Sequence, residues 1–334
     1  MTAPPILDVS NLTKHFAIPH GLLGRQEHIV RAVDAVSFTL GHGQTLALVG
    51  ESGCGKTTLA RMLLKLLTPT SGSVKIDGKE VGSMSRAEMR TFRTDVQAVF
   101  QDPWASLSPR MRVFDIVAET LVINDNLTNG ELTRRVDEAL IAVGLRPDQA
   151  RNYPHEFSGG QRQRIAIASA IIAKPRLIIL DEPVSALDVS IRSQIMNLFK
   201  DLQEAVGCSY VIVAHDLGTT RFMADRIAVM YLGKLVEIGP VDEMFDAPRH
   251  PYTQALLSAA LPLRVGNAHE AVVLRGEVPS PVNPPTGCPF HPRCQSLIGE
   301  ICETSPPMPK ELGTKSHMMS CHLDAAGKRA FKGR

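Results

Sequence analysis

The sequence predicts an α/β fold built around a parallel sheet. Two short apolar segments, Thr45–Val49 and Leu177–Leu180, are typical of buried parallel strands. The first runs into a glycine-rich turn followed by a helical segment, and the second ends in two carboxylates. Ligands of such sheets bind at the carboxyl edge of the strands. We therefore expect the functional residues to follow the ends of these two strands.

The turn after the first strand has the complete pattern of a phosphate-binding loop. It reads G-x-x-x-x-G-K-T, and glycine there lets main-chain N–H groups curl around a phosphate where a Cβ would obstruct them. Lys56 is expected to contact the β- and γ-phosphates, and the Thr57 hydroxyl to ligate Mg²⁺. The N-terminus of the predicted helix Leu59–Leu67 adds its partial positive charge to the phosphate site. The loop predicts a nucleotide site formed by Gly50, Glu51, Ser52, Gly53, Cys54, Gly55, Lys56, Thr57 and Thr58.

The two carboxylates after the second strand supply the chemistry of such a site. Asp181 is expected to hold Mg²⁺ directly or through water, and Glu182 to accept a proton from an attacking water. A solvated strand end in an unrelated α/β protein could carry the same two residues. The acidic pair is specific only in combination with the phosphate loop, because the two motifs together predict nucleotide hydrolysis.

A serine–glycine turn precedes the acidic pair. The segment Phe157–Gln161 opens a helical stretch, so it offers a second helix N-terminus for an anion, with the Ser158 hydroxyl beside it. A lone Ser-Gly-Gly would be an ordinary flexible turn, but its place shortly before Asp181 makes the pattern specific. The residues expected to contact the nucleotide here are Ser158, Gly159, Gly160 and Gln161.

With these motifs in place, residues 7–245 resemble the nucleotide-binding subunits of ABC transporters. The resemblance implies a P-loop NTPase core of the RecA-like kind, with an antiparallel β subdomain and a helical insertion at about residues 94–174. Within that insertion, apolar residues at helical spacing predict one buried helix face. These residues are Val136, Ala139, Leu140 and Val143.

The resemblance also implies roles for residues outside these motifs. Gln101 matches the glutamine that reaches Mg²⁺ and the attacking water, and His215 matches the histidine that contacts the γ-phosphate. Asp188 lies in the matching loop after the acidic pair. Phe16 takes the place of the aromatic that stacks on adenine, although Tyr is commoner there and packing on the sheet is the alternative. The implied catalytic residues are Glu182, His215 and Gln101, and the implied Mg²⁺ ligands are Thr57, Gln101 and Asp181.

The phosphate loop and the Ser158 turn are two separate anion sites, which one nucleotide in one monomer rarely satisfies. The resemblance implies that two ATPase subunits join head to tail and enclose ATP between the Lys56 loop of one and the Ser158 turn of the other. The family mostly pairs two different subunits, which implies a paralogue as the partner. Two membrane-spanning permease subunits and, indirectly, an extracytoplasmic solute-binding protein complete the implied assembly.

Length, charge and the pattern of apolar residues exclude several classes of protein. The 334 residues suffice for two domains or for one large domain with an appendix, and the net charge of +2 argues against a dedicated nucleic-acid binder. The N-terminus lacks a signal-peptide pattern, and the longest apolar stretches are too short for a bilayer span. Whatever this chain does at a membrane, we therefore expect it to do from the aqueous side, and the resemblance implies a peripheral protein on the cytoplasmic face of the inner membrane.

We expect a nucleotide-binding domain over residues 1–261 and a Pro/Cys-rich appendix over residues 262–334. Nine of the 23 prolines lie between Pro279 and Pro309, which disfavours long helices and central strands there. Without a secretion signal the thiols should stay reduced, so a cluster of four suggests a metal centre rather than disulfides. The four thiols belong to Cys288, Cys294, Cys302 and Cys321.

The nature of that centre stays open. An iron–sulfur cluster needs four thiolates and tolerates irregular spacing. The missing C-x₂-C pair weakens a zinc site, although His291, His317 or His322 could replace a thiol. Unligated thiols are the third alternative. Cys54 and Cys208 are expected to take no part.

The tail from His250 to Pro289 resembles one subfamily, the ATPase subunits of oligopeptide and dipeptide importers, some of which carry a [4Fe–4S] cluster. It implies an ATP-hydrolysing subunit that couples ATP to the uptake of di- or oligopeptides or related small solutes. A soluble ABC ATPase without a transporter is the alternative, but such proteins usually carry two nucleotide domains or a long coiled coil. An ABC exporter would commonly fuse membrane helices to the ATPase. The solute is not encoded here, since selectivity belongs to the other subunits.

Overall fold

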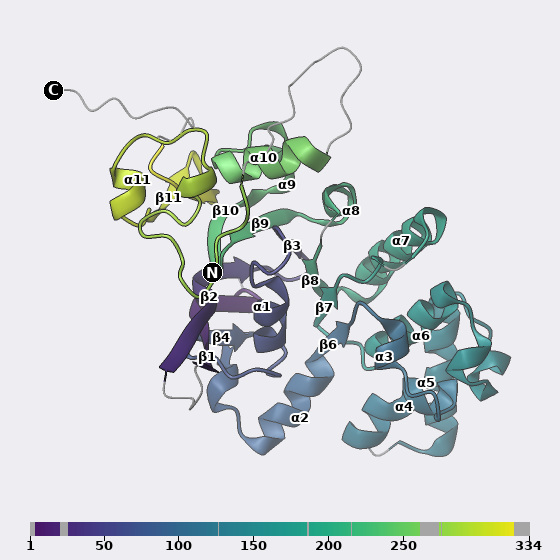
Figure 1. The fold of residues 1–334 in the computed structure, drawn as a ribbon. Coiled ribbons are helices and arrows are strands. Elements are labelled where there is room, and N and C mark those ends of the chain that lie inside the picture. The colour runs from purple at the N-terminus through teal and green to yellow at the C-terminus, as the bar shows by residue number, and fades with distance from the viewer. Residues whose placement is uncertain are drawn as a thin grey trace, which may run out of the picture. The chain divides into compact units, whose positions relative to one another are not determined.

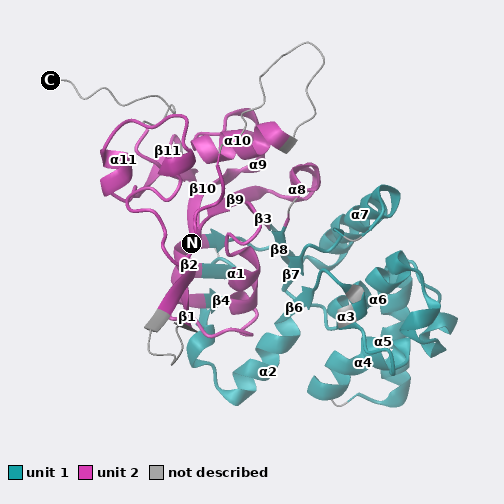
Figure 2. Ribbon diagram, in the orientation of Figure 1, with its two compact units in different colours: residues 1–8, 39–45, 75–213 teal, residues 9–38, 46–74, 214–334 magenta. Residues whose placement is uncertain are grey.

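The computed structural model describes residues 4–20, 26–125, 127–185, 187–214, 216–260, 274 and 276–323. The chain divides into two compact units, each assembled from several segments (Figure 2). Unit 1 contains residues 1–8, 39–45 and 75–213, and unit 2 contains residues 9–38, 46–74 and 214–334. The helices and strands are numbered in chain order, and Figure 1 labels most of them.

Unit 1 contains three neighbouring parallel strands, one of which ends in the acidic pair. They are β6 (Val96–Val99), β7 (Leu177–Asp181) and β8 (Ser209–Val213). β7 lies between the other two, with Leu180 in register with Val99 and Ile212. All of β8 and all but the last residue of β7 are buried, which explains their continuous apolar sequence. Unit 1 also contains β5 (Lys79–Glu80), which pairs with the end of β4 (Ser71–Ile76).

In unit 1, one helix precedes β6 and the others follow it along the chain (Figure 1). Those described are α2 (Arg86–Asp95), α3 (Pro103–Ser106), α4 (Val113–Asn124), α5 (Asn129–Ala142), α6 (Gly159–Ile171) and α7 (Val189–Val206), with 3₁₀ turns at Val81–Ser83, Pro147–Arg151 and Pro154–Glu156. The predicted apolar face of α5 is buried where α5 contacts α4 and α6. Within the expected insertion, residues 96–99 form β6, and helices α3 to α6 follow it.

Unit 2 contains a run of strands that reaches into the C-terminal part of the chain. They are β3 (Thr45–Val49, from its second residue on), β9 (Arg226–Tyr231), β10 (Lys234–Pro240), β11 (Pro309–Leu312) and β12 (Thr314–Ser320). β3 pairs with β9 in parallel, whereas β9–β10, β10–β12 and β12–β11 are antiparallel pairs. The chain therefore returns to the sheet after its proline-rich segment, and Pro309 begins the edge strand, where proline is tolerated.

Most residues of the two long N-terminal strands also belong to unit 2. β1 (Leu7–His20) lies between β2 (Gln26–Leu40) and β4. The described helices of this unit are α1 (Lys56–Leu63), α8 (Leu217–Met223), α9 (Val241–Asp246), α10 (Pro251–Ala260) and α11 (Ile301–Thr304), with a 3₁₀ turn at His291–Arg293. Among the residues described in both units, no helix combines the length and apolarity that crossing a membrane requires.

Helix α1 differs from the sequence prediction at both ends. It begins at Lys56 rather than Leu59, because Gly55 closes the preceding loop with a left-handed φ of 108°. It ends at Leu63 rather than Leu67, because Lys65 adopts a left-handed φ of 55° that stops the helix. The Lys56 side chain therefore leaves from the first turn of α1.

Candidate functional site

The loop between β3 and α1 in unit 2 has the close main-chain packing that its glycines predict. Gly50 adopts a φ of 148°, and a Cβ there would lie 2.2 Å from the Met230 carbonyl oxygen. At Gly55, a Cβ would lie 2.1 Å from the Ala32 carbonyl oxygen. Neither position can accept a side chain without displacing a neighbouring strand, so both glycines are required by the fold of the loop.

The Lys56 ammonium lies inside this loop. Its Nζ donates hydrogen bonds to the carbonyl oxygens of Gly50 at 2.7 Å and Glu51 at 3.1 Å, and the residue is 4% exposed. The loop is thus wrapped around a fixed positive charge, the arrangement that a phosphate-binding loop needs. Burial raises the pKa of the Cys54 thiol beside it, so this cysteine is a small apolar residue of the loop.

Two residues far along the chain anchor Glu51 of the same loop. The Glu51 main-chain N–H donates to the Tyr252 hydroxyl at 2.9 Å. The Glu51 carboxylate accepts two hydrogen bonds from the Arg293 guanidinium, at 2.6 and 3.0 Å. The sequence prediction missed both anchors. No local pattern marks them, because they lie 201 and 242 residues from Glu51.

In unit 1, the acidic pair stands at the end of β7 as predicted. Asp181 is the last residue of the strand, and the Glu182 N–H donates to the Val213 carbonyl at 3.0 Å. Glu182 adopts a left-handed φ of 51°, which costs a non-glycine residue about 1–2 kcal/mol. Six other non-glycine residues among those described also have a positive φ, including Lys65 at the end of α1. The turn is held by the Ser185 hydroxyl, which donates to the Glu182 carbonyl at 3.1 Å.

The predicted serine–glycine turn begins α6. The Gln161 N–H donates to the Ser158 hydroxyl oxygen at 3.4 Å, and the Ser158 N–H donates to the Gln161 side-chain oxygen at 3.0 Å. This reciprocal cap fixes the first turn of the helix. A Cβ at Gly160 would lie 2.8 Å from Cγ2 of Ile191 on α7, so glycine also permits close packing there.

The remaining predicted site residues are distributed over both units. In unit 1, Gln101 follows β6 and is exposed, and Asp188 is the residue before α7. In unit 2, Phe16 is half-buried on β1, with the Lys14 ammonium 5.1 Å from its ring centroid. His215 lies outside the described residues.

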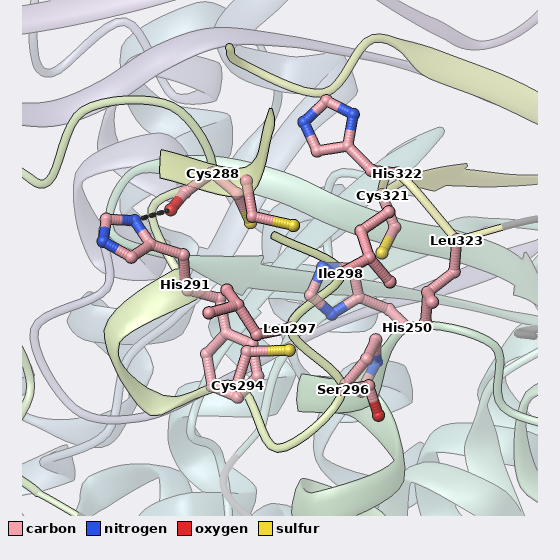
Figure 3. Close-up of a pocket in the computed structure, with 13 residues that line it drawn as sticks. His250, Cys288, His291, Cys294, Ser296, Leu297, Ile298, Cys321, His322 and Leu323 are labelled. Carbon is pink, nitrogen blue, oxygen red and sulfur yellow. Dashed lines mark hydrogen bonds between the residues drawn. The ribbon is translucent and has the colours of Figure 1, made fainter. Parts of the chain in front are cut away.

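The four C-terminal cysteines line one cavity of unit 2 (Figure 3). The labelled side chains of Cys288, Cys294 and Cys321 point their sulfur atoms toward a common space, and Cys302 belongs to the same lining. Burial, reinforced by the neighbouring thiols, raises the pKa of Cys288 to about 12 and that of Cys294 to about 11. Among the described residues, no three His, Cys, Asp or Glu side chains converge closely enough to meet a metal-binding geometry.

The histidines expected near these thiols divide into two groups. His291 and His322 line the cavity, as does the buried His250. His317 does not, because its Nε2 lies 2.8 Å from the Glu237 carboxylate and its Nδ1 lies 3.1 Å from that of Glu243.

Two family descriptions match the chain. The ABC transporter family matches residues 33–185, and the oligopeptide/dipeptide transporter C-terminal region matches residues 236–302. The first match contains the phosphate loop, the Ser158 turn and the acidic pair. The second contains Tyr252 and Arg293 together with three of the four clustered cysteines.

The similarity to characterised relatives extends over nearly the whole chain. The oligopeptide transport ATP-binding protein AppF of Bacillus subtilis is 47% identical, covering 95% of this chain and 97% of that protein. The dipeptide transport ATP-binding protein DppF of Escherichia coli is 45% identical, covering 90% of each. Among solved structures, the ATP-binding cassette MJ0796, in a dimeric post-hydrolysis state bound to ADP and Pi, is 29% identical with a TM-score of 0.62. That match covers 70% of this chain and 98% of the solved one.

Proposed function

This chain belongs to the ABC transporter family as an ATP-binding subunit with ATPase activity, and we propose that it couples ATP hydrolysis to the uptake of di- or oligopeptides or related small solutes. The observation that carries the proposal is similarity over almost the full length to proteins named for peptide transport, including the C-terminal region of that class. A soluble ABC ATPase is the alternative, and the matching C-terminal region argues against it.

For the nucleotide, we propose the roles that the motifs predict. Gly50–Thr58, with Lys56 at its centre, holds the phosphates, and Phe16 stacks on adenine. The Ser158–Gln161 turn and Asp188 contact the nucleotide bound by a second ATPase subunit. Both anion sites suit this division, since one is a glycine loop around an ammonium and the other is a capped helix start.

For hydrolysis, we propose Glu182 as the base that accepts a proton from the attacking water, with Gln101 orienting that water and His215 contacting the γ-phosphate. Thr57, Gln101 and Asp181 would hold Mg²⁺, which supplies neutralisation of phosphate charge. The hydroxyl and carboxylate oxygens among these side chains are the donors that Mg²⁺ prefers.

For the assembly, we propose a head-to-tail pair of ATPase subunits, the second being a paralogue, beneath two membrane-spanning permease subunits. An extracytoplasmic binding protein would deliver the solute. The chain would then be a peripheral protein on the cytoplasmic face of the inner membrane, with no nucleic-acid partner. We also propose residues 1–261 as its nucleotide-binding domain and residues 262–334 as an appendix.

For the appendix, we propose that the four clustered cysteines hold a metal centre, with a [4Fe–4S] cluster as the first hypothesis and zinc as the second. The support is chemical. Four thiols line one cavity. No three of the described ligand side chains lie close enough to hold a metal, so binding would require the thiols to draw together. Metal binding would also have to overcome the raised thiol pKa values that burial causes. Such a centre would cross-link a proline-rich segment.

Uptake of a labelled dipeptide tests the transport function. Cells that lack this subunit are complemented with the wild-type chain, with Glu182→Gln, or with Glu204→Gln as a matched exposed control. We expect uptake from the wild type and the control but not from Glu182→Gln. Uptake that is unchanged by loss of the subunit, while the purified chain still hydrolyses ATP, would favour the soluble ATPase or another solute.

A further inference from the structure

Arg293 connects the cysteine region to the phosphate loop. It lies in the sequence between Cys288 and Cys294 and directly precedes Cys294. Its guanidinium nevertheless contacts Glu51, with Nη1 donating at 2.6 Å and Nη2 at 3.0 Å to the two carboxylate oxygens. A two-pronged pair of this kind fixes both the distance and the orientation of its partners.

Burial makes this pair different from an ordinary surface ion pair. The Arg293 side chain is 6% exposed and that of Glu51 is 26% exposed. The guanidinium is also within 3.4 Å of the Tyr231 hydroxyl. Removing the Glu51 carboxylate would leave the buried Arg293 guanidinium without its charged partner, which costs far more stability than breaking an ion pair at the surface.

An aromatic cluster holds both anchors of Glu51 in one rigid block. The rings of Tyr231, Tyr252 and Phe290 are buried, with centroids 4.7 to 5.3 Å apart. Tyr252 accepts the hydrogen bond from the Glu51 N–H, and Phe290 lines the cysteine cavity. The loop is thus held at Glu51 through its main chain and its side chain, and both contacts depend on the packing of the same block.

Glu51 is a sensitive place for such an anchor. It follows Gly50 directly, and its carbonyl oxygen is one of the two that accept hydrogen bonds from the Lys56 ammonium. A shift of Glu51 would therefore move the ammonium and the loop N–H groups that bind phosphate, and small displacements of preorganised donors cost binding.

We propose that Arg293 is a positioning residue of the phosphate loop: by holding the Glu51 carboxylate it sets the affinity for ATP and ties the loop to the packing of the cysteine cavity. Arg293 itself contacts no nucleotide in this scheme. The inference rests on the proposed ATP-binding function, and it adds a role for the C-terminal region in that function.

A double-mutant cycle tests the proposal. The affinity for a fluorescent ATP analogue is measured by titration for the wild type, Arg293→Met, Glu51→Gln and the double variant. We expect each single change to weaken binding about tenfold, within the usual range for coupled sites. The double variant should bind no more weakly than either single variant, because both changes break the same contact. The KM for ATP should rise in parallel, with a smaller change in kcat.

Controls separate this outcome from misfolding. Arg146→Met removes an arginine from an exposed pair with Asp148 and should leave affinity unchanged. If Arg293→Met does not fold, Arg293→Lys keeps the charge without the two-pronged geometry and should still weaken binding. Wild-type affinity in the Arg293 variants, or single effects that simply add in the double variant, would overturn the proposal. A wild-type chain that binds no ATP would instead refute the nucleotide-binding function.

Discussion

The Glu237 carboxylate on β10 and the His317 imidazole on β12 lie 2.8 Å apart, with both side chains almost completely buried. The contact joins two adjacent antiparallel strands of unit 2. Burial would lower the pKa of His317, but the Glu237 and Glu243 carboxylates outweigh it and raise that pKa. For Glu237, burial would raise the pKa, but the hydrogen bonds from His317 and from main-chain N–H groups lower it.

These shifts predict a pH-dependent contribution to stability. A raised histidine pKa stabilises the fold below the unfolded value of 6.5, and this stabilisation is lost as pH rises through the folded pKa. The lowered Glu237 pKa acts at acidic pH. Its contribution to stability is lost as the pH falls through the pKa that Glu237 has in the folded protein. His317→Leu should lower the free energy of unfolding by about 3 kcal/mol near pH 6, because a buried carboxylate loses its partner.

Chemical unfolding at pH 6 and pH 9 measures this difference. The difference in the free energy of unfolding between wild type and His317→Leu should shrink at pH 9. The control variant His155→Leu, at an exposed position, should match the wild type at both pH values. His250, whose pKa burial lowers to about 4, titrates below the range from pH 6 to pH 9. A gap that grows with pH would contradict the assignment of the pair.

Replacing the proposed base should separate ATP binding from hydrolysis. Glu182→Gln keeps the size of the side chain but cannot accept a proton, so turnover should fall at least about 100-fold. Nucleotide binding should persist, and the variant should accumulate as an ATP-closed pair of subunits. ATPase assays and size-exclusion chromatography with Mg²⁺-ATP report both effects when the proposed partner subunit is present. Wild-type turnover in Glu182→Gln would show that another residue is the base.

The phosphate loop should tolerate no side chain at Gly55. Gly55→Ala would place a Cβ 2.1 Å from the Ala32 carbonyl oxygen at a left-handed φ, so we expect loss of nucleotide binding and destabilisation of about 3 kcal/mol or more. Gly43→Ala is the matched control, because Gly43 also has a positive φ but an added Cβ meets nothing within 4 Å. The control should cost about 1–2 kcal/mol of stability from backbone strain and leave binding intact. Equal effects of the two changes would mean that the predicted clash is relieved.

Metal content tests the proposed centre in the appendix. Anaerobically purified wild type should contain iron and sulfide with a broad visible absorption, or zinc under the second hypothesis. Replacing Cys288, Cys294, Cys302 or Cys321 by serine should lower the metal content. Cys208→Ser should leave it unchanged, because Cys208 is buried next to Tyr210 and does not line the cysteine cavity. Unchanged content in all four variants would rule out a site built from these thiols.

The sequence by itself determined the parts of this protein whose geometry is local. The glycine loop around Lys56, the acidic pair after β7 and the capped start of α6 each occupy a few consecutive residues, so spacing alone fixes their backbone. The apolar face of α5 followed from the helical period for the same reason. The predicted start and end of α1 were wrong, because they are set by the left-handed backbone of Gly55 and Lys65 and not by the spacing of apolar residues.

Only the tertiary structure decided what supports the phosphate loop. Tyr252 and Arg293 reach Glu51 because β9, β10 and β12 pair side by side and an aromatic cluster packs between the loop and the cysteine cavity. His317 is likewise committed to Glu237 rather than to the thiols. Contacts across such distances in sequence depend on the path of the whole chain, because burial and packing of many residues fix which side chains meet.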